Sequence, residues 1–242
     1  MYGWRGRIGI IIPADNGVLE PDFYRLAPDG VSTHVARLCK SPRAEYPAQA
    51  IQLAESSLRH TRVNIVGHMC AASSFLLGPK GNEEFCDQLT KASGGLPSFT
   101  ASTSMVAALS SLEARTISVI SPHIPEIAQH LTDYLKASGF TVGELVALGL
   151  GAGVELGAIN DTSPEQIYKI ARKLDMTGVD ALFIAATNFR AIDVIETIEA
   201  DIGRPVITSN QAGMWVALGL LGVSAVPSGF GSLFKGPTYK SP

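Results

Sequence analysis

The chain has 242 residues, of which 46% are hydrophobic and 17% charged, and its formal net charge is -3. This composition suits a sizeable buried core and excludes a disordered or coiled-coil chain. The weakly acidic balance, without a basic run, argues against a nucleic-acid partner. No stretch reaches the roughly 20 apolar residues of a membrane span, and the apolar run Ile8–Ile12 is too short for a secretion signal. We therefore expect a cytoplasmic protein that does not act at a membrane.

Short β-branched runs alternate with helical stretches along the chain. The predicted strands are Arg7–Ile12, Val63–Met69, Ser98–Thr100, Ile117–Ile120, Thr141–Leu148, Ala181–Ile184 and Val206–Thr208. The predicted helices are Pro47–His60, Asn82–Ser93, Pro125–Ser138, Pro164–Thr177 and Asp193–Ile202. Alternation of this kind favours the α/β class, with parallel sheets covered by helices on both faces.

Two segments of the first half recur in the second half in the same order. Residues 7–13 resemble residues 116–122, and residues 95–100 resemble residues 203–208. Between these marks, one half has a strand that ends at Cys70 and the other has a strand that ends at Ala186. We therefore predict two pseudo-symmetric α/β lobes, one made of residues 1–112 plus 215–242 and the other of residues 113–214.

Small or polar residues follow four of the predicted strands. These strand ends are Pro13–Asn16, Cys70–Ser74, Pro122–His123 and Ala186–Asn188. Open parallel sheets bind ligands at the carboxyl ends of their strands, so two facing lobes bring these ends to one cleft. Main-chain N–H groups, amides and hydroxyls in such positions hold carboxylates. The pattern predicts a small carboxylate or dicarboxylate ligand.

Cys70 is the predicted reactive group. It follows a buried strand and opens a helix, where the helix dipole and free N–H groups lower the pKa of a thiol. The alternative is a buried cysteine that only packs as a small apolar side chain. Cys39 and Cys86 lack this position, and three cysteines favour free thiols over a disulfide framework. Metal-ligand spacing, a Walker loop and a dinucleotide-binding fingerprint are missing from the sequence, so we expect no metal and no cofactor.

These motifs resemble the aspartate/glutamate racemase superfamily, in particular its maleate isomerase and arylmalonate decarboxylase branch, and the ectoine-utilisation relatives are also similar. Pro13–Glu20 resembles the opening of maleate isomerases, Cys70–Ser73 resembles their first catalytic-cysteine segment, and Ala186–Arg190 resembles the second, which reads Cys-Thr-Asn in isomerases. The resemblance implies two lobes with the site between them, cofactor-free chemistry and a homo-oligomer. It places catalysis at Cys70 and at the position of Ala186. The substrate-binding residues expected from the strand ends and from the resemblance are Pro13, Asn16, Ala71, Ala72, Ser73, His123, Asn160, Thr187 and Asn188.

The resemblance implies cis–trans isomerisation of a small carboxylate, in which one cysteine adds to the double bond and a second handles the proton. Ala186 replaces that second cysteine and has no group that can transfer a proton. Three interpretations are open. The alanine replaces a native cysteine and inactivates an isomerase; or Cys70 naturally acts alone, as the proton donor of a malonate-type decarboxylase; or the protein binds a carboxylate without catalysis.

Overall fold

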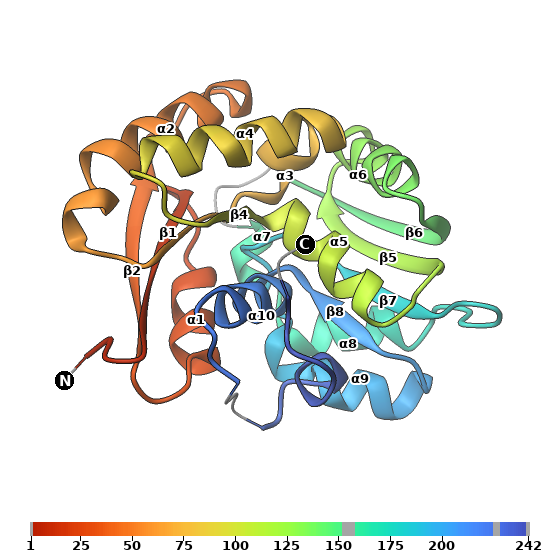
Figure 1. Ribbon diagram of the computed structural model, residues 1–242. Coiled ribbons are helices and arrows are strands. Elements are labelled where there is room, and N and C mark those ends of the chain that lie inside the picture. Colours follow the sequence, from red (N-terminus) through yellow and green to blue (C-terminus); the bar gives the residue numbers. More distant parts are fainter. Residues whose placement is uncertain (1, 152–157, 225–227, 241–242) are drawn as a thin grey trace.

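Two four-stranded parallel sheets form the framework of the protein (Figure 1). The structure is a computed structural model that describes residues 2–151, 158–224 and 228–240. The strands of the first sheet are β1 (Gly6–Pro13), β2 (Val31–Leu38), β3 (Ile65–His68) and β4 (Ser98–Thr100). Those of the second are β5 (Thr116–His123), β6 (Thr141–Leu150), β7 (Ala181–Ile184) and β8 (Val206–Thr208). The strand orders, β2-β1-β3-β4 and β6-β5-β7-β8, are equivalent, which confirms the predicted α/β class and the duplication.

Helices cover both sheets. The α-helices are α1 (Leu19–Leu26), α2 (Tyr46–Ser56), α3 (Ala71–Phe75), α4 (Gly78–Ala92), α5 (Ala101–Ser111), α6 (Pro125–Ala137), α7 (Ala158–Asp161), α8 (Pro164–Ala171), α9 (Ile195–Ile202) and α10 (Ser209–Leu220). The 3-10 turns are η1 (Arg43–Glu45), η2 (Leu58–Thr61), η3 (Ile192–Val194) and η4 (Ser232–Lys235). None of the described helices is long and apolar enough to cross a membrane.

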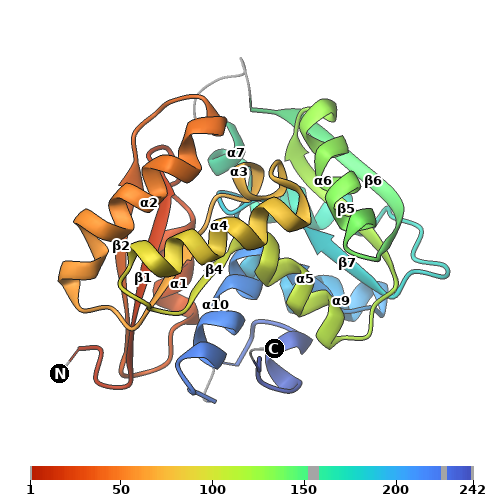
Figure 2. The same cartoon turned by 45° about the horizontal axis from the view of Figure 1, so that its top comes forward.

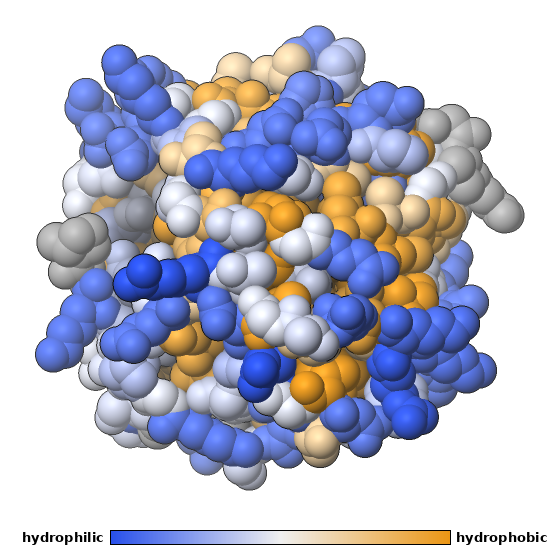
Figure 3. Space-filling model, turned by 90° about the vertical axis from the view of Figure 1, so that its right-hand side faces the viewer, coloured by the Kyte–Doolittle hydropathy of each residue, from blue (hydrophilic) through white to orange (hydrophobic). Residues whose placement is uncertain are grey.

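The first sheet is buried on both faces. Side chains alternate along a strand, so neighbouring residues of β1 pack on opposite faces of the sheet. Ile11 packs with α2 and α4 in one cluster, whereas Ile10 and Ile12 belong to a larger cluster that extends into the second lobe. In Figure 2, α2 and α4 lie over the first sheet and α6 lies over β5 and β6. The outer strand β6 has half-buried residues at its last six positions, and Figure 3 shows apolar surface on this side of the molecule.

Helices α5 and α10 occupy equivalent places in the two halves and pack against each other between the sheets (Figure 1). Each begins directly after the last strand of its sheet. Thr100 caps α5 and Thr208 caps α10, each in a reciprocal capping box that satisfies two N–H groups of the helix terminus. This pair joins the two lobes through a shared core.

Several elements differ from the sequence-based prediction. Strand β2 and helices α1, α5 and α7 were not predicted, α4 begins at Gly78 rather than at Asn82, and α8 ends at Ala171 rather than at Thr177. Strand β2 lies at the sheet edge, and its buried positions do not alternate regularly, so the period-two pattern is weak. After Ala171 the chain forms turns that reach Gly178, whose φ of 69° is outside the helical range.

Candidate active site

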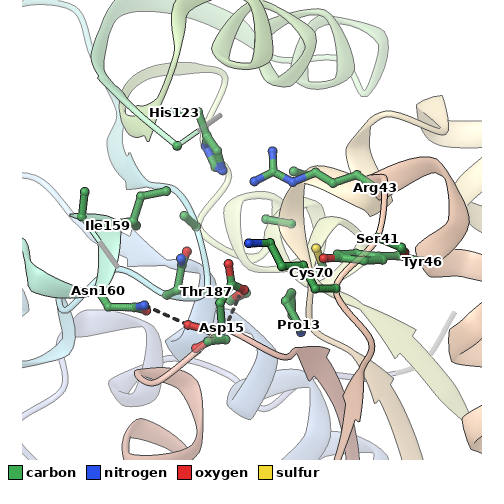
Figure 4. A pocket seen from close by; sticks show the side chains of 18 of the residues that line it. Pro13, Asp15, Ser41, Arg43, Tyr46, Cys70, His123, Ile159, Asn160 and Thr187 are labelled. Atoms are coloured by element: carbon green, nitrogen blue, oxygen red, sulfur yellow. Dashed lines mark hydrogen bonds between the residues drawn. The ribbon is translucent and has the colours of Figure 1, made fainter. Parts of the chain in front are cut away.

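A cavity of about 430 Å³ lies where the carboxyl ends of strands from both sheets converge (Figure 4). Its wall from the first lobe consists of Pro13, Asp15, Asn16, Cys70, Ala71 and Ala72, and that from the second consists of His123, Ala186, Thr187 and Asn188. The remaining lining residues are Lys40, Ser41, Pro42, Arg43, Tyr46, Gly151, Ala158, Ile159 and Asn160. The structure thus brings every predicted site residue except Ser73 to one cavity. The catalytic and binding roles of these residues stay predictions.

Cys70 lies between β3 and α3, in extended conformation at the cap position of the helix, and its side chain is 5% exposed. Burial raises the pKa of its thiol, while the polar groups of Ser73 and the positive charge of Arg43 lower it. The net direction is upward, so the expectation of a lowered pKa was wrong. Helix α3 has only five residues, and the cost of desolvating a thiolate outweighs its effect. At neutral pH the group is therefore a thiol that carries a proton.

Ser73 lies beneath the cavity rather than in its wall. Its hydroxyl donates to the Cys70 carbonyl at 3.3 Å and lies 2.7 Å from Nε2 of His68. Burial lowers the pKa of His68 to about 3, so its imidazole is neutral. The Ser73 hydroxyl has one proton, so Nε2–H of His68 donates to it. These contacts fix the backbone at Cys70 from below.

Ala186 occupies the position in the second lobe that corresponds to Cys70, but its backbone differs. Its φ is 81°, in the left-handed region that alanine rarely adopts, and its side chain is 4% exposed. Such a conformation costs of order 1 kcal/mol or more and persists only where the surroundings enforce it. The next residue, Thr187, supplies that constraint, because its hydroxyl donates to the Met69 carbonyl at 3.0 Å and accepts from Nδ2 of Asn16 at 3.0 Å. The two strand ends are thereby tied together across the lobes.

Asn16 and Asn160 shape the loop after β1. Oδ1 of Asn16 accepts from the backbone N–H groups of Val18 and Leu19, each at 3.0 Å. Nδ2 of Asn160 donates to the Asp15 carbonyl at 2.8 Å, and its Oδ1 accepts from the Gly17 N–H at 3.4 Å. An amide nitrogen carries two protons, and Nδ2 of each residue makes one hydrogen bond with the described residues. Each therefore has one further N–H without a partner among the described residues, and both residues line the cavity.

His123 is a neutral side chain in the wall of the cavity. Burial, and then the charge of Arg43, lower its pKa to about 3. Its Nδ1 lies 3.1 Å from Oγ of Ser121, which also accepts from the His123 backbone N–H at 3.4 Å.

Sequence reasoning missed the wall that follows β2, with Lys40, Arg43 and Tyr46. The other four strand ends were identified by small or polar residues that follow a predicted strand. Polar residues also follow directly after β2, but this strand was not predicted, so its end was not considered. Groups of three or more His, Cys, Asp or Glu able to hold a metal ion do not occur among the described residues.

A sequence profile described as arylmalonate decarboxylase matches residues 8–234 of this chain. The chain belongs to the arylmalonate decarboxylase family. An arylmalonate decarboxylase of Bordetella bronchiseptica is 27% identical over 236 residues, which cover 94% of this chain and 95% of that protein. A maleate isomerase of Nocardia farcinica is 25% identical over 255 residues, which cover 95% of each protein.

Solved structures of the same two kinds of enzyme share the fold. A variant of the maleate isomerase of Pseudomonas putida S16 with maleate has a TM-score of 0.89 at 23% identity, covering 96% of this chain and 98% of that one. A variant of the Nocardia farcinica maleate cis-trans isomerase with a covalently bound succinylcysteine intermediate has a TM-score of 0.86 at 24% identity, covering 95% and 98%. These structures confirm the fold, and the family profile together with the two relatives of known activity confirms the superfamily branch that the sequence motifs predicted.

Proposed function

We propose that this protein is a cofactor-independent isomerase of the maleate type, which acts on a small dicarboxylate with Cys70 as the nucleophile. The observation that carries the proposal is the Cys70 thiol in a cavity between two lobes whose strand ends present N–H donors. The full-length similarity to maleate isomerases and the succinylcysteine intermediate of one relative support it. Cytoplasmic location and homo-oligomeric state remain predictions from the sequence.

The geometry supports reversible addition of the thiol across a carbon–carbon double bond. The Cys70 sulfur forms a bond to one alkene carbon, the π bond breaks, and the thiol proton passes to the neighbouring carbon. Rotation about the resulting single bond and loss of the same sulfur and a proton restore the double bond in the trans form. Backbone N–H groups at the strand ends, and His123 in its Nε2–H tautomer, act in this proposal as donors for the enediolate that develops on the carboxylate, and such donors are typically worth about 3 kcal/mol each.

A malonate-type decarboxylase is the second candidate, favoured by the single thiol that lines the cavity and by the family profile. Loss of CO2 from a malonate leaves its electron pair on an enediolate. The Cys70 thiol then donates its proton to the carbon, and water returns a proton to the thiolate. Ala186 is no obstacle to this reaction, because one proton donor on one face suffices.

One experiment separates these functions. The chain, its Ala186→Cys variant and its Cys70→Ala variant are incubated with maleate and with an arylmalonate in D2O, and the products are followed by NMR. Fumarate formed by either Cys70-containing protein and not by Cys70→Ala supports the isomerase, and fumarate from Ala186→Cys alone shows that the second thiol is required. A deuterated monoacid from the chain itself supports the decarboxylase. Binding of both acids without turnover by any of the three proteins would contradict both enzymes and leave a carboxylate-binding protein.

A further inference from the structure

The guanidinium of Arg43 points into the cavity between His123 and Cys70 (Figure 4). Arg43 opens the 3-10 turn η1 after strand β2 and is partly buried. Within the described ranges its guanidinium has no hydrogen bond or ion pair, whereas the neighbouring Arg37 binds Glu20 at 2.7 Å. A guanidinium has five N–H donors in a planar fork that fits a carboxylate. Those of Arg43 are available to a ligand in the cavity.

The charges around the cavity leave Arg43 without an internal counter-ion. Asp15 is the one carboxylate among the described lining residues, and it is exposed, whereas Lys40 and Arg43 both contribute positive charge. His123 is neutral, and burial keeps Cys70 protonated. Arg43 acts electrostatically on both of these groups, so its charge is felt at the centre of the site. An anion in the cavity would bring the local charge closer to balance.

In addition to backbone N–H groups, His123 and the exposed Lys40, the wall has two separate sets of side-chain N–H donors. One group lies at the junction of the lobes, where Asn16 and Asn160 each keep a free N–H beside the strand end at Thr187. The other is the guanidinium of Arg43, which reaches the cavity from the β2 side (Figure 4). A molecule with one carboxylate uses only one of these groups, whereas a dicarboxylate uses both.

We infer that Arg43 binds the second carboxylate of the substrate and restricts this site to dianions. The inference rests on the proposed function, because it takes this cavity as the active site. An aromatic ring in place of the second carboxylate would leave the guanidinium partly desolvated without a hydrogen-bond acceptor, which is unfavourable. Arg43 is therefore a specificity-determining residue that favours short diacids over monoacids of the same length.

Calorimetric binding of two unreactive probes tests the inference. Succinate has two carboxylates and no double bond, and succinamate has the same skeleton with one carboxylate replaced by a neutral amide. We expect the chain to bind succinate at least tenfold more tightly than succinamate. Arg43→Met should weaken succinate binding about 10- to 100-fold, the range for a charge-assisted hydrogen-bonded pair, and change succinamate binding less than threefold. Arg43→Lys should be intermediate, because it keeps the charge without the fork.

The matched control is Arg59→Met, which removes an exposed arginine on η2 that does not line the cavity. It should leave both affinities unchanged, and the thermal midpoint of Arg43→Met should equal that of the chain. Succinate affinities of Arg43→Met and of the chain within threefold would overturn the inference, as would equal affinities of the chain for the two probes. Neither probe can react, so this result is independent of whether the protein isomerises maleate. If it does, Arg43→Met should raise KM for maleate more than it lowers kcat.

Discussion

The stability of this protein should depend on pH through one buried carboxyl group, that of Asp22. This residue lies on α1, its side chain is 6% exposed, and its Oδ2 accepts from Nδ2 of Asn210 at 2.7 Å. The same Nδ2 donates to the Thr187 carbonyl at 3.0 Å, so Asp22 lies two hydrogen bonds from the wall of the cavity. The Asn210 Oδ1 is buried and without a hydrogen-bond partner among the described residues. Among the described residues, the carboxyl thus accepts one side-chain hydrogen bond, and it is largely shielded from solvent.

Burial raises the pKa of Asp22 from the ordinary 3.8 to about 7. The negative charge of Asp193 adds to this effect, while the hydrogen bond from Asn210 and the charges of Arg25 and Arg190 oppose it. When the pKa of a carboxyl is higher in the folded than in the unfolded state, the free energy of unfolding falls as the pH rises from the unfolded pKa to the folded pKa, because the carboxyl ionises more readily in the unfolded chain. The contribution of Asp22 is therefore fully favourable below about pH 4 and is lost as the pH rises to about 7. At about 1.4 kcal/mol for each pH unit between the two pKa values, the loss is about 4 kcal/mol.

The Asp22→Asn variant isolates this effect, because an amide keeps an oxygen that accepts from Asn210 but does not ionise. Free energies of unfolding in urea, followed by circular dichroism, are measured for both proteins between pH 4 and pH 8. We expect the free energy of unfolding of the chain to fall by about 4 kcal/mol relative to that of the variant over this range. The exposed Asp29→Asn serves as the control and should follow the chain. A difference between chain and Asp22→Asn that stays constant within about 1 kcal/mol would refute the reasoning.

Two further predictions concern the strand ends. Thr187→Val should lower the free energy of unfolding, measured with urea, by about 2–4 kcal/mol, because the Met69 carbonyl and Nδ2 of Asn16 lose their shared buried partner. Thr187→Ser keeps the hydroxyl and should retain most of the stability of the chain. Equal stability of the two variants would contradict the bridging role. Alkylation of Cys70 by iodoacetamide, followed by peptide mass spectrometry, should still accelerate above pH 9, since burial raises the pKa of this thiol; a plateau below pH 8 would contradict the protonated state.

The sequence was sufficient to predict the inner strands β1, β3, β5 and β7, because buried parallel strands are continuous apolar runs. Ala181–Ile184 agrees with β7 at both ends, and the outer strands β4 and β8 lie in the repeated segments 95–100 and 203–208. Four strand ends that the sequence singled out all contribute to one cavity. The edge strand β2 has polar residues at half-buried positions, so it has neither a continuous apolar run nor a regular alternation. Arg43 follows β2 and was therefore not predicted as a site residue, because a strand end can be identified only when the strand itself is predicted.

Two properties of the site depend on tertiary packing and could not be predicted. The position of Cys70 at the start of a helix indicated a lowered pKa, but the sequence does not give the degree of burial, which decides the direction. The positive φ of Ala186 was also unexpected, since alanine has no preference for it. That conformation depends on the contacts of Thr187 with Met69 and Asn16, which are distant in the sequence.

Duplication supplies two equivalent strand ends, and this chain uses them for different purposes. The end of β3 presents a thiol in extended backbone, with φ of -124° at Cys70, whereas the end of β7 has φ of 81° at Ala186 and a threonine that ties the lobes together. Proton transfer from protein thiols in the cavity can therefore reach the substrate only from the side of Cys70. A one-sided donor suits reactions in which bond making and bond breaking occur on the same face, such as addition and loss of one sulfur or protonation of one enediolate. It does not suit racemisation, which requires a proton donor on each face of the carbon.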